Sequence, residues 1–157
     1  VKNFVLCKPS NYIQFTPEKF QQVAPKDKYR AKEKIIYRFI SKYLVFAYDD
    51  EQKLTLNSAN IIIPKIPNYP IKVILALFNS SVYQFIFQKK FSSIKILRSH
   101  IEQMPLPLWD KKTFEKIIEM VNSIIKYKTV FEELDNYIMD KYVFSTKEKN
   151  YLTMFSK

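Results

Sequence analysis

The hydrophobic positions of the chain follow two different spacings. Between residues 34 and 63, short runs of β-branched and aromatic residues are separated by polar turns, which is the pattern of β-strands. It predicts strands at residues 34–40, 44–48, 54–56 and 60–63. The second and third strands form a hairpin around the acidic turn at residues 49–52, whose aspartates we expect in the left-handed conformation that glycine normally supplies.

The remaining apolar positions predict helices. The run from Ile71 to Phe87 is interrupted by polar residues and is shorter than the roughly 20 residues of a membrane span, so we interpret it as one long buried helix. After Asp110, apolar residues recur at helical spacing and predict two amphipathic helices, and a Ser-x-x-Glu capping box at residues 145–148 begins a last short helix. A proline after Thr16 predicts another short helix, over residues 17–23.

These elements predict an α+β fold with a small, mainly antiparallel sheet, a buried central helix and a C-terminal helical hairpin. The 157 residues suffice for one compact unit. Within it we expect residues 1–109 to form a basic α+β domain and residues 110–157 to form amphipathic helices packed on that domain. A basic loop is expected at residues 89–98, and the prolines at 105 and 107 forbid a regular helix there.

Positive charge is concentrated in the first two thirds of the chain. The formal net charge is +11. Residues 1–109 carry 17 Lys and Arg against 7 Asp and Glu, whereas residues 110–157 carry 9 against 8. A basic surface attracts polyanions, and nucleic acid is the usual partner of such a surface. The alternative interpretation is a solvated surface that keeps the protein in solution.

Several kinds of chemistry are excluded by residues that the sequence lacks. Without glycine it cannot form a Walker A phosphate loop or a Gly-rich nucleotide turn. The single cysteine, Cys7, and the single histidine, His100, cannot form an internal disulfide or a Cys/His zinc site. We therefore assign no catalytic residue and no metal ligand, and interpret His100 as a helix-cap or surface residue. No secretory signal follows Val1, and we expect a reduced, cytoplasmic setting.

Five short motifs occur in an order found in one protein family. They are Lys34-Ile35-Ile36-Tyr37-Arg38, Leu56-Asn57-Ser58, Leu77-Phe78-Asn79-Ser80, Ile101 followed by Pro105-Leu106-Pro107, and a tail with Leu134-Asp135 and Tyr142-Val143-Phe144. Together they resemble the TaqI-like C-terminal specificity domain of adenine-N6 DNA methyltransferases and Type IIG restriction-modification enzymes. The resemblance covers most of residues 32–155. Val143 stands where the family commonly has glycine, which leaves the geometry of that turn open.

The resemblance implies sequence-specific binding of double-stranded DNA, with catalysis in a region outside this chain. The domain would lie beside the catalytic methyltransferase domain of the same parent chain and help choose the sequence whose adenine is flipped out. No cofactor is implied for this chain; the parent is expected to use S-adenosylmethionine, and Mg²⁺ if it also cleaves DNA. The parent is expected to be a bacterial, cytoplasmic enzyme without a membrane partner, and apolar stripes on the tail helices would allow weak homodimers.

The candidate DNA contacts lie in two basic segments and combine cations for phosphates with groups that can reach base edges. In the first segment they are Lys28, Arg30, Lys32, Lys34, Arg38, Lys42 and Tyr43. In the second they are Lys89, Lys90, Ser92, Ser93, Lys95 and Arg98. The ring of Tyr43 could stack on a base or pack within the protein.

Structural roles compete with DNA contact at several positions. Arg38 could bind a guanine edge but is equally suited to an internal salt bridge. Asn57 and Asn79 are interpreted as residues that cap backbone groups, because asparagine beside serine is typical of element boundaries. Tyr37 and Tyr48 are interpreted as core residues of the strands.

Two other functions fit parts of the sequence. The amphipathic C-terminal helices could make the chain a protein-interaction module, with its basic charge incidental. The carboxylates at residues 49–51 could hold a metal in a nuclease, but we interpret them as a solvent-exposed turn. Steeply salt-dependent DNA binding would distinguish target recognition from a protein-interaction module. Metal-dependent cleavage would identify a nuclease.

Overall fold

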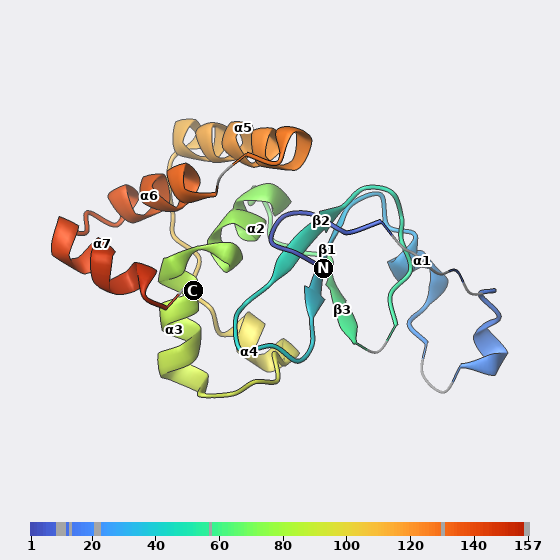
Figure 1. The fold of residues 1–157 in the computed structure, drawn as a ribbon. Coiled ribbons are helices and arrows are strands. Elements are labelled where there is room, and N and C mark those ends of the chain that lie inside the picture. The colour runs from blue at the N-terminus through green and yellow to red at the C-terminus, as the bar shows by residue number, and fades with distance from the viewer. Residues whose placement is uncertain (9–11, 13, 21–22, 57, 130, 156–157) are drawn as a thin grey trace.

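The computed structural model describes residues 1–8, 12, 14–20, 23–56, 58–129 and 131–155. A three-stranded antiparallel sheet lies beside a group of helices, and the predicted α+β fold is confirmed (Figure 1). In chain order the elements are the 3-10 turn η1 (Pro17–Lys19), α1 (Lys26–Tyr29), β1 (Lys34–Arg38), β2 (Phe46–Asp49), β3 (Ala59–Ile62), α2 (Ile71–Asn79), α3 (Ser81–Phe91), α4 (Arg98–Glu102), α5 (Lys111–Tyr127), α6 (Glu132–Lys141) and α7 (Thr146–Thr153).

Strand β1 is the centre of the sheet, whose order is β2-β1-β3. Ile36 of β1 lies opposite Ala47 of β2 and opposite Ile61 of β3. The strands predicted at 34–40, 44–48 and 60–63 are therefore confirmed as β1, β2 and β3, although β1 is shorter than predicted, β2 begins two residues later and β3 begins one residue earlier. The predicted hairpin is wrong, because β2 pairs with β1 and residues 54–56 form no strand.

The turn after β2 is organised by a single carboxylate. Asp49 accepts hydrogen bonds from the backbone N–H groups of Glu51 (3.3 Å) and Lys53 (2.9 Å). The left-handed residue of this turn is Gln52, at φ 56°, and not an aspartate as predicted. Because Asp49 ties the chain back on itself, the segment that follows leaves the edge of β2 instead of pairing with it.

The outer edge of β2 is closed by other parts of the chain. Phe4 lies alongside it, donating its N–H to the Phe46 carbonyl (2.7 Å) and accepting from the N–H of Tyr48 (3.1 Å). The Asn79 carboxamide accepts from Phe46 N (3.1 Å) and donates to Phe46 O (2.9 Å), and Gln84 does the same for Leu44, at 2.8 Å each. These contacts satisfy an edge that would otherwise be open to other strands. They confirm the structural role of Asn79, while Asn57 lies outside the described residues.

The long helix predicted over 71–87 is two helices, α2 and α3, whose axes differ by 67°. Ser80 breaks the helix with an extended backbone, and its hydroxyl accepts a hydrogen bond from Tyr83 N (3.4 Å). Ser81 then begins α3, and its N–H donates to the Asp135 carboxylate (2.8 Å). No single helix among the described residues is long and apolar enough to cross a membrane; α2 and α3 meet that test only when the bent pair is counted together.

Asp135 should make stability depend on pH. Burial raises the pKa of this carboxyl above its ordinary value of 3.8, against the hydrogen bonds from Ser81 that lower it. The folded state therefore retains the proton over an interval in which the unfolded chain has lost it, so the contribution of Asp135 to stability falls as pH rises from 3.8 through the folded pKa. Urea unfolding across this interval should show wild type losing stability relative to Asp135→Asn. A constant difference between the two proteins would contradict the assignment.

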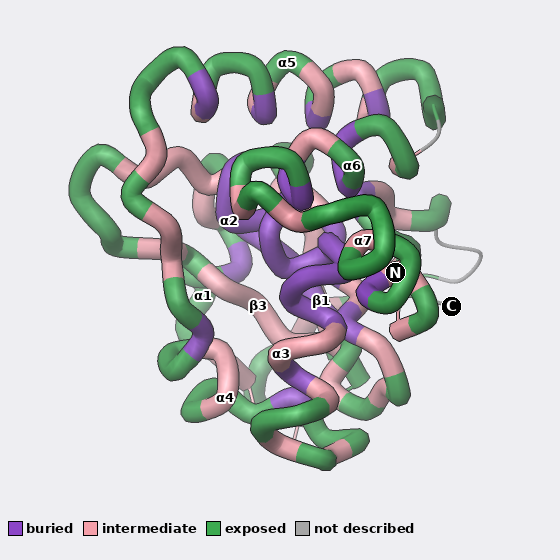
Figure 2. Tube along the Cα trace, turned by 90° about the vertical axis from the view of Figure 1, so that its left-hand side faces the viewer, coloured by how far each residue is buried: buried purple, intermediate pink, exposed green. Residues whose placement is uncertain are grey.

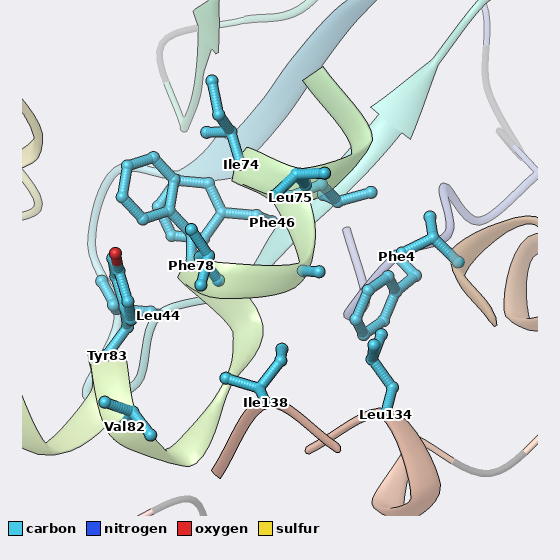
Figure 3. Packing of buried hydrophobic residues seen from close by; sticks show 14 of the residues in the cluster. Phe4, Leu44, Phe46, Ile74, Leu75, Phe78, Val82, Tyr83, Leu134 and Ile138 are labelled. Atoms are coloured by element: carbon cyan, nitrogen blue, oxygen red, sulfur yellow. The ribbon is translucent and has the colours of Figure 1, made fainter. Parts of the chain in front are cut away.

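One hydrophobic core joins the sheet to the helices. Helix α2 lies at its centre and is buried along most of its length (Figure 2). Phe46 of β2 packs on Phe78 of α2 with ring centroids 5.1 Å apart, and Phe4 lies close to Leu134 of α6 (Figure 3). Helix α5 packs on α2 through Ile117, Val121 and Ile124, which are buried in the same core.

The structure gives the geometry of the turn at Val143, which the sequence leaves open. It takes the left-handed conformation, φ 60°, directly after α6. Its N–H donates to Asp140 O (3.0 Å) and the N–H of Phe144 donates to Met139 O (3.4 Å), which together form a Schellman C-cap. The geometry is therefore the one that glycine favours, adopted here by a β-branched residue.

Replacing Val143 by glycine should raise the free energy of unfolding by about 1 kcal/mol. The left-handed conformation costs a residue with a Cβ roughly 1–2 kcal/mol, part of which is offset by the greater freedom of glycine in the unfolded chain. The Val143 side chain is 88% exposed, so little packing is lost. Urea unfolding measures the change, with Val143→Ala as the control that retains a Cβ. Loss of stability in the glycine variant would contradict the expectation.

Candidate nucleic-acid interface

Parts of the two predicted basic segments lie side by side where β1 ends. Ile40 and Lys95 form an antiparallel bridge, flanked by hydrogen bonds from Ser41 N to Ile94 O (2.9 Å) and from Ile96 N to Phe39 O (2.8 Å). Figure 1 places α4 beside the turn that joins β1 to β2. We call residues 38–43 and 92–98 together the basic ribbon.

The basic ribbon carries four exposed cations. Arg38 donates from Nε (3.1 Å) and Nη2 (2.7 Å) to the Val1 carbonyl, so it contacts backbone instead of an acid. Lys42 lies over the ring of Tyr43, which is half-buried, with 5.4 Å from Nζ to the ring centroid. Lys95 is exposed, and Arg98 pairs with Glu102 at 2.7 Å. The ribbon residues include no acid, so the local field is positive.

The two predicted serines shape the loop of the basic ribbon. Ser92 ends α3: it takes a left-handed conformation, φ 44°, and its hydroxyl donates to Gln88 O at 3.4 Å. The Ser93 hydroxyl accepts from the N–H of Lys95 at 3.1 Å. Both serines thus help to present Lys95, and the exposed Ser92 remains near the cations.

Lys89 and Lys90 lie on the last turn of α3, not in the predicted loop. Lys90 donates from Nζ to Gln103 O (3.2 Å), at the end of α4. Lys89 lies over Phe155 with 5.4 Å from Nζ to the ring centroid, on the side of the helix that meets the C-terminal segment. Lys90 therefore borders the basic ribbon, whereas Lys89 is held next to the tail.

Three predicted contacts lie at the opposite end of β1. Lys28, Arg30 and Lys32 precede the strand and are exposed, and Arg30 donates from Nη1 to Gln52 O at 2.9 Å. Figure 1 shows α1 on the far side of the sheet from α3. The structure does not bring these cations to the basic ribbon.

Lys34 is a correction to the predicted contacts. Its side chain is 0% exposed and forms an ion pair with the equally buried Asp49, while Nζ also donates to Tyr29 O at 2.7 Å. A buried ammonium cannot reach a phosphate, so Lys34 is a structural residue. Asp49 is likewise not part of a solvent-exposed turn as predicted, since only Asp50 and Glu51 are exposed there.

Other predicted roles are met by local contacts. His100 caps α4, because its Nδ1 accepts the N–H of Leu97 (3.4 Å), and its ring stacks on Phe91 with centroids 4.4 Å apart. Tyr37 is buried, as predicted. Tyr48 is half-buried and packs against the core, with its hydroxyl donating to Glu33 at 2.7 Å.

The proline turn that follows α4 is held by tyrosine hydroxyls. Tyr83 donates to the Pro105 carbonyl and Tyr69 donates to the Pro107 carbonyl at 3.2 Å. Burial raises the pKa of both phenols, which keeps them protonated as donors. These bonds anchor the proline turn to α3 and to the segment that precedes α2.

Sequence reasoning did not single out the apolar residues of the basic ribbon. Ile40, Ile94 and Leu97 are exposed between the cations, at 58%, 62% and 39% of their surface. The signal that could have identified them is that each of the two cation-rich segments has an isoleucine near its centre. Binary patterning assigns such an isoleucine to the core, so it was not considered as an exposed residue.

One comparison with known proteins bears on this surface. The model of the TaqI-like C-terminal specificity domain family matches residues 1–106, which contain the whole basic ribbon. No curated protein matches the chain.

Proposed function

Because the chain belongs to the family of TaqI-like C-terminal specificity domains, we propose that it binds a specific DNA sequence through the basic ribbon. The parent enzyme would be an adenine-N6 DNA methyltransferase or a Type IIG restriction-modification enzyme. Membership of the family supports target recognition, and the ribbon is the surface on which cations from two distant segments meet.

The single observation that carries the proposal is the pairing of residues 39–41 with residues 94–96. It places Arg38, Lys42 and Lys95 on a short two-stranded pairing, and Arg98 follows it as the first residue of α4. The major groove of B-DNA is about 12 Å wide and admits a two-stranded ribbon. Cations at the margins of such a ribbon suit phosphate contacts, which position a protein on the duplex.

In this proposal the chain contributes binding and not bond-making. The methyl donor S-adenosylmethionine, and Mg²⁺ if the parent also cleaves DNA, would be held by the catalytic region of the same parent chain. That region would share the DNA duplex with this domain while the target adenine is flipped out. The absence of glycine from the sequence supports a division of labour of this kind.

The protein-interaction alternative has less apolar surface available than the sequence suggests. The apolar stripes of α5 and α6 pack into the core through residues such as Ile117, Val121, Leu134 and Ile138. Weak self-association through the remaining exposed residues stays a prediction, which sedimentation at increasing protein concentration would measure.

Selection of DNA from a random duplex library across a salt series tests the proposal. The expected result is an enriched sequence motif together with an affinity that falls steeply as salt rises, because phosphate contacts release counterions. Salt-dependent binding without a motif would place specificity partly in the catalytic region. Failure to bind any duplex at low salt would overturn the proposal in favour of protein interaction.

A further inference from the structure

We propose that Ile40 and Leu97 contact the C5-methyl groups of thymines in the major groove, making them specificity-determining residues. The inference rests on the proposed function, since it needs the basic ribbon to meet DNA. It assigns a base-reading role to side chains that carry no charge and no hydrogen-bonding group.

The backbone pairing places both side chains on the outer surface of the basic ribbon. Residues directly opposite in an antiparallel pair project to the same face, so Ile40 lies beside Lys95. Side chains two residues apart in an extended strand share a face, which adds Leu97 to that surface. The residues that directly precede them in the chain, Phe39 and Ile96, are half-buried and fully buried.

Charge around these residues favours a nucleic acid as the occupant. Ile40 is 58% exposed between Arg38 and Lys42, and Leu97 is 39% exposed between Lys95 and Arg98. An apolar protein partner would have to desolvate four cations to cover two aliphatic side chains, which is costly. A DNA groove offers phosphates on both sides to those cations and leaves the centre of the ribbon facing the base edges.

The major groove presents one apolar group at its base edges, the thymine methyl. An isoleucine or leucine that buries this methyl gains roughly fourfold in affinity for each methyl group covered. Cations that contact phosphates bind DNA of any sequence, because the phosphate backbone is the same in all of them. Discrimination between sequences therefore has to come from other side chains, here the two aliphatic residues.

Two duplex pools of identical random sequence test the inference without knowledge of the recognition site. One pool is synthesised with thymidine and the other with deoxyuridine, which lacks only the C5-methyl group. The intact chain should bind the thymidine pool several-fold more tightly. Ile40→Ala with Leu97→Ala should remove most of this preference, while Lys95→Ala should weaken binding to both pools and retain the preference.

Leu108→Ala is the matched control, because this side chain is 98% exposed in the segment before α5 and lies outside the ribbon. It should leave both affinity and preference unchanged. Equal binding of the two pools by the intact chain, or a preference that survives the loss of both aliphatic side chains, would overturn the inference while leaving DNA binding intact. Failure to bind either pool at low salt would overturn the proposed function as well.

Discussion

Replacing Lys34 by methionine should lower the free energy of unfolding by about 3–5 kcal/mol. The substitution leaves the Asp49 carboxylate buried without its cation, and breaking one partner of a buried ion pair costs this much. It also removes the hydrogen bond from Nζ to Tyr29 O, which ties α1 to β1. Urea denaturation of the variant and of wild type measures the difference.

Two matched variants separate the buried pair from general effects of charge. Lys32→Met removes an exposed cation two residues away and should change stability by less than about 0.5 kcal/mol. Lys34→Met combined with Asp49→Asn removes both charges and keeps a side-chain oxygen that can accept from Lys53 N, so it should recover most of the lost stability. A Lys34→Met protein that is as stable as wild type but binds DNA weakly would return Lys34 to the interface.

Removing Lys42 and Lys95 together should weaken DNA binding by more than tenfold. Each phosphate contact contributes about 0.9 to the slope of log affinity against log salt, which near 0.1 M corresponds to roughly eightfold in affinity for each lost contact. The double variant Lys42→Ala, Lys95→Ala should therefore bind less tightly and with a shallower slope, as fluorescence anisotropy with a labelled duplex would record.

Exposed lysines elsewhere give the comparison for this result. Lys112 and Lys147 lie in the first turns of α5 and α7, outside the ribbon, and their double alanine variant removes the same net charge. This control variant should change the slope of log affinity against log salt only slightly. If Lys28→Ala with Lys32→Ala weakened binding as much as the ribbon variant, the DNA would extend along β1 to the α1 end, and the ribbon would not be the principal contact.

The sequence predicts elements whose periodicity is local. The runs of β-branched and aromatic residues around β1 and β3 and the helical spacing of α5 and α6 are present within each segment, so they could be identified without tertiary information. The pairing of β2 could not, because its partner is selected by the core and by Asp49 instead of by a turn signal. The break at Ser80 depends on Asp135, a residue 54 positions away in the sequence from its hydrogen-bond partner Ser81.

The candidate site could be predicted in part for the same reason. A count of cations identifies both basic segments, but only tertiary contact reveals that residues 39–41 and 94–96 pair, and that the cations before β1 lie elsewhere. Lys34 was misassigned because a lysine at the start of a strand has the same pattern whether it faces solvent or a buried aspartate. Ile40 and Leu97 were missed because an apolar residue in a strand-like segment is expected in the core.

An NMR titration of the amide groups with a short duplex tests most directly the claim that the basic ribbon is the DNA-binding surface. The largest chemical-shift changes should occur at residues 38–43 and 92–98, with smaller changes at the α1 end and almost none in α5 to α7. Changes concentrated in the tail helices, with the ribbon unaffected at saturation, would contradict it.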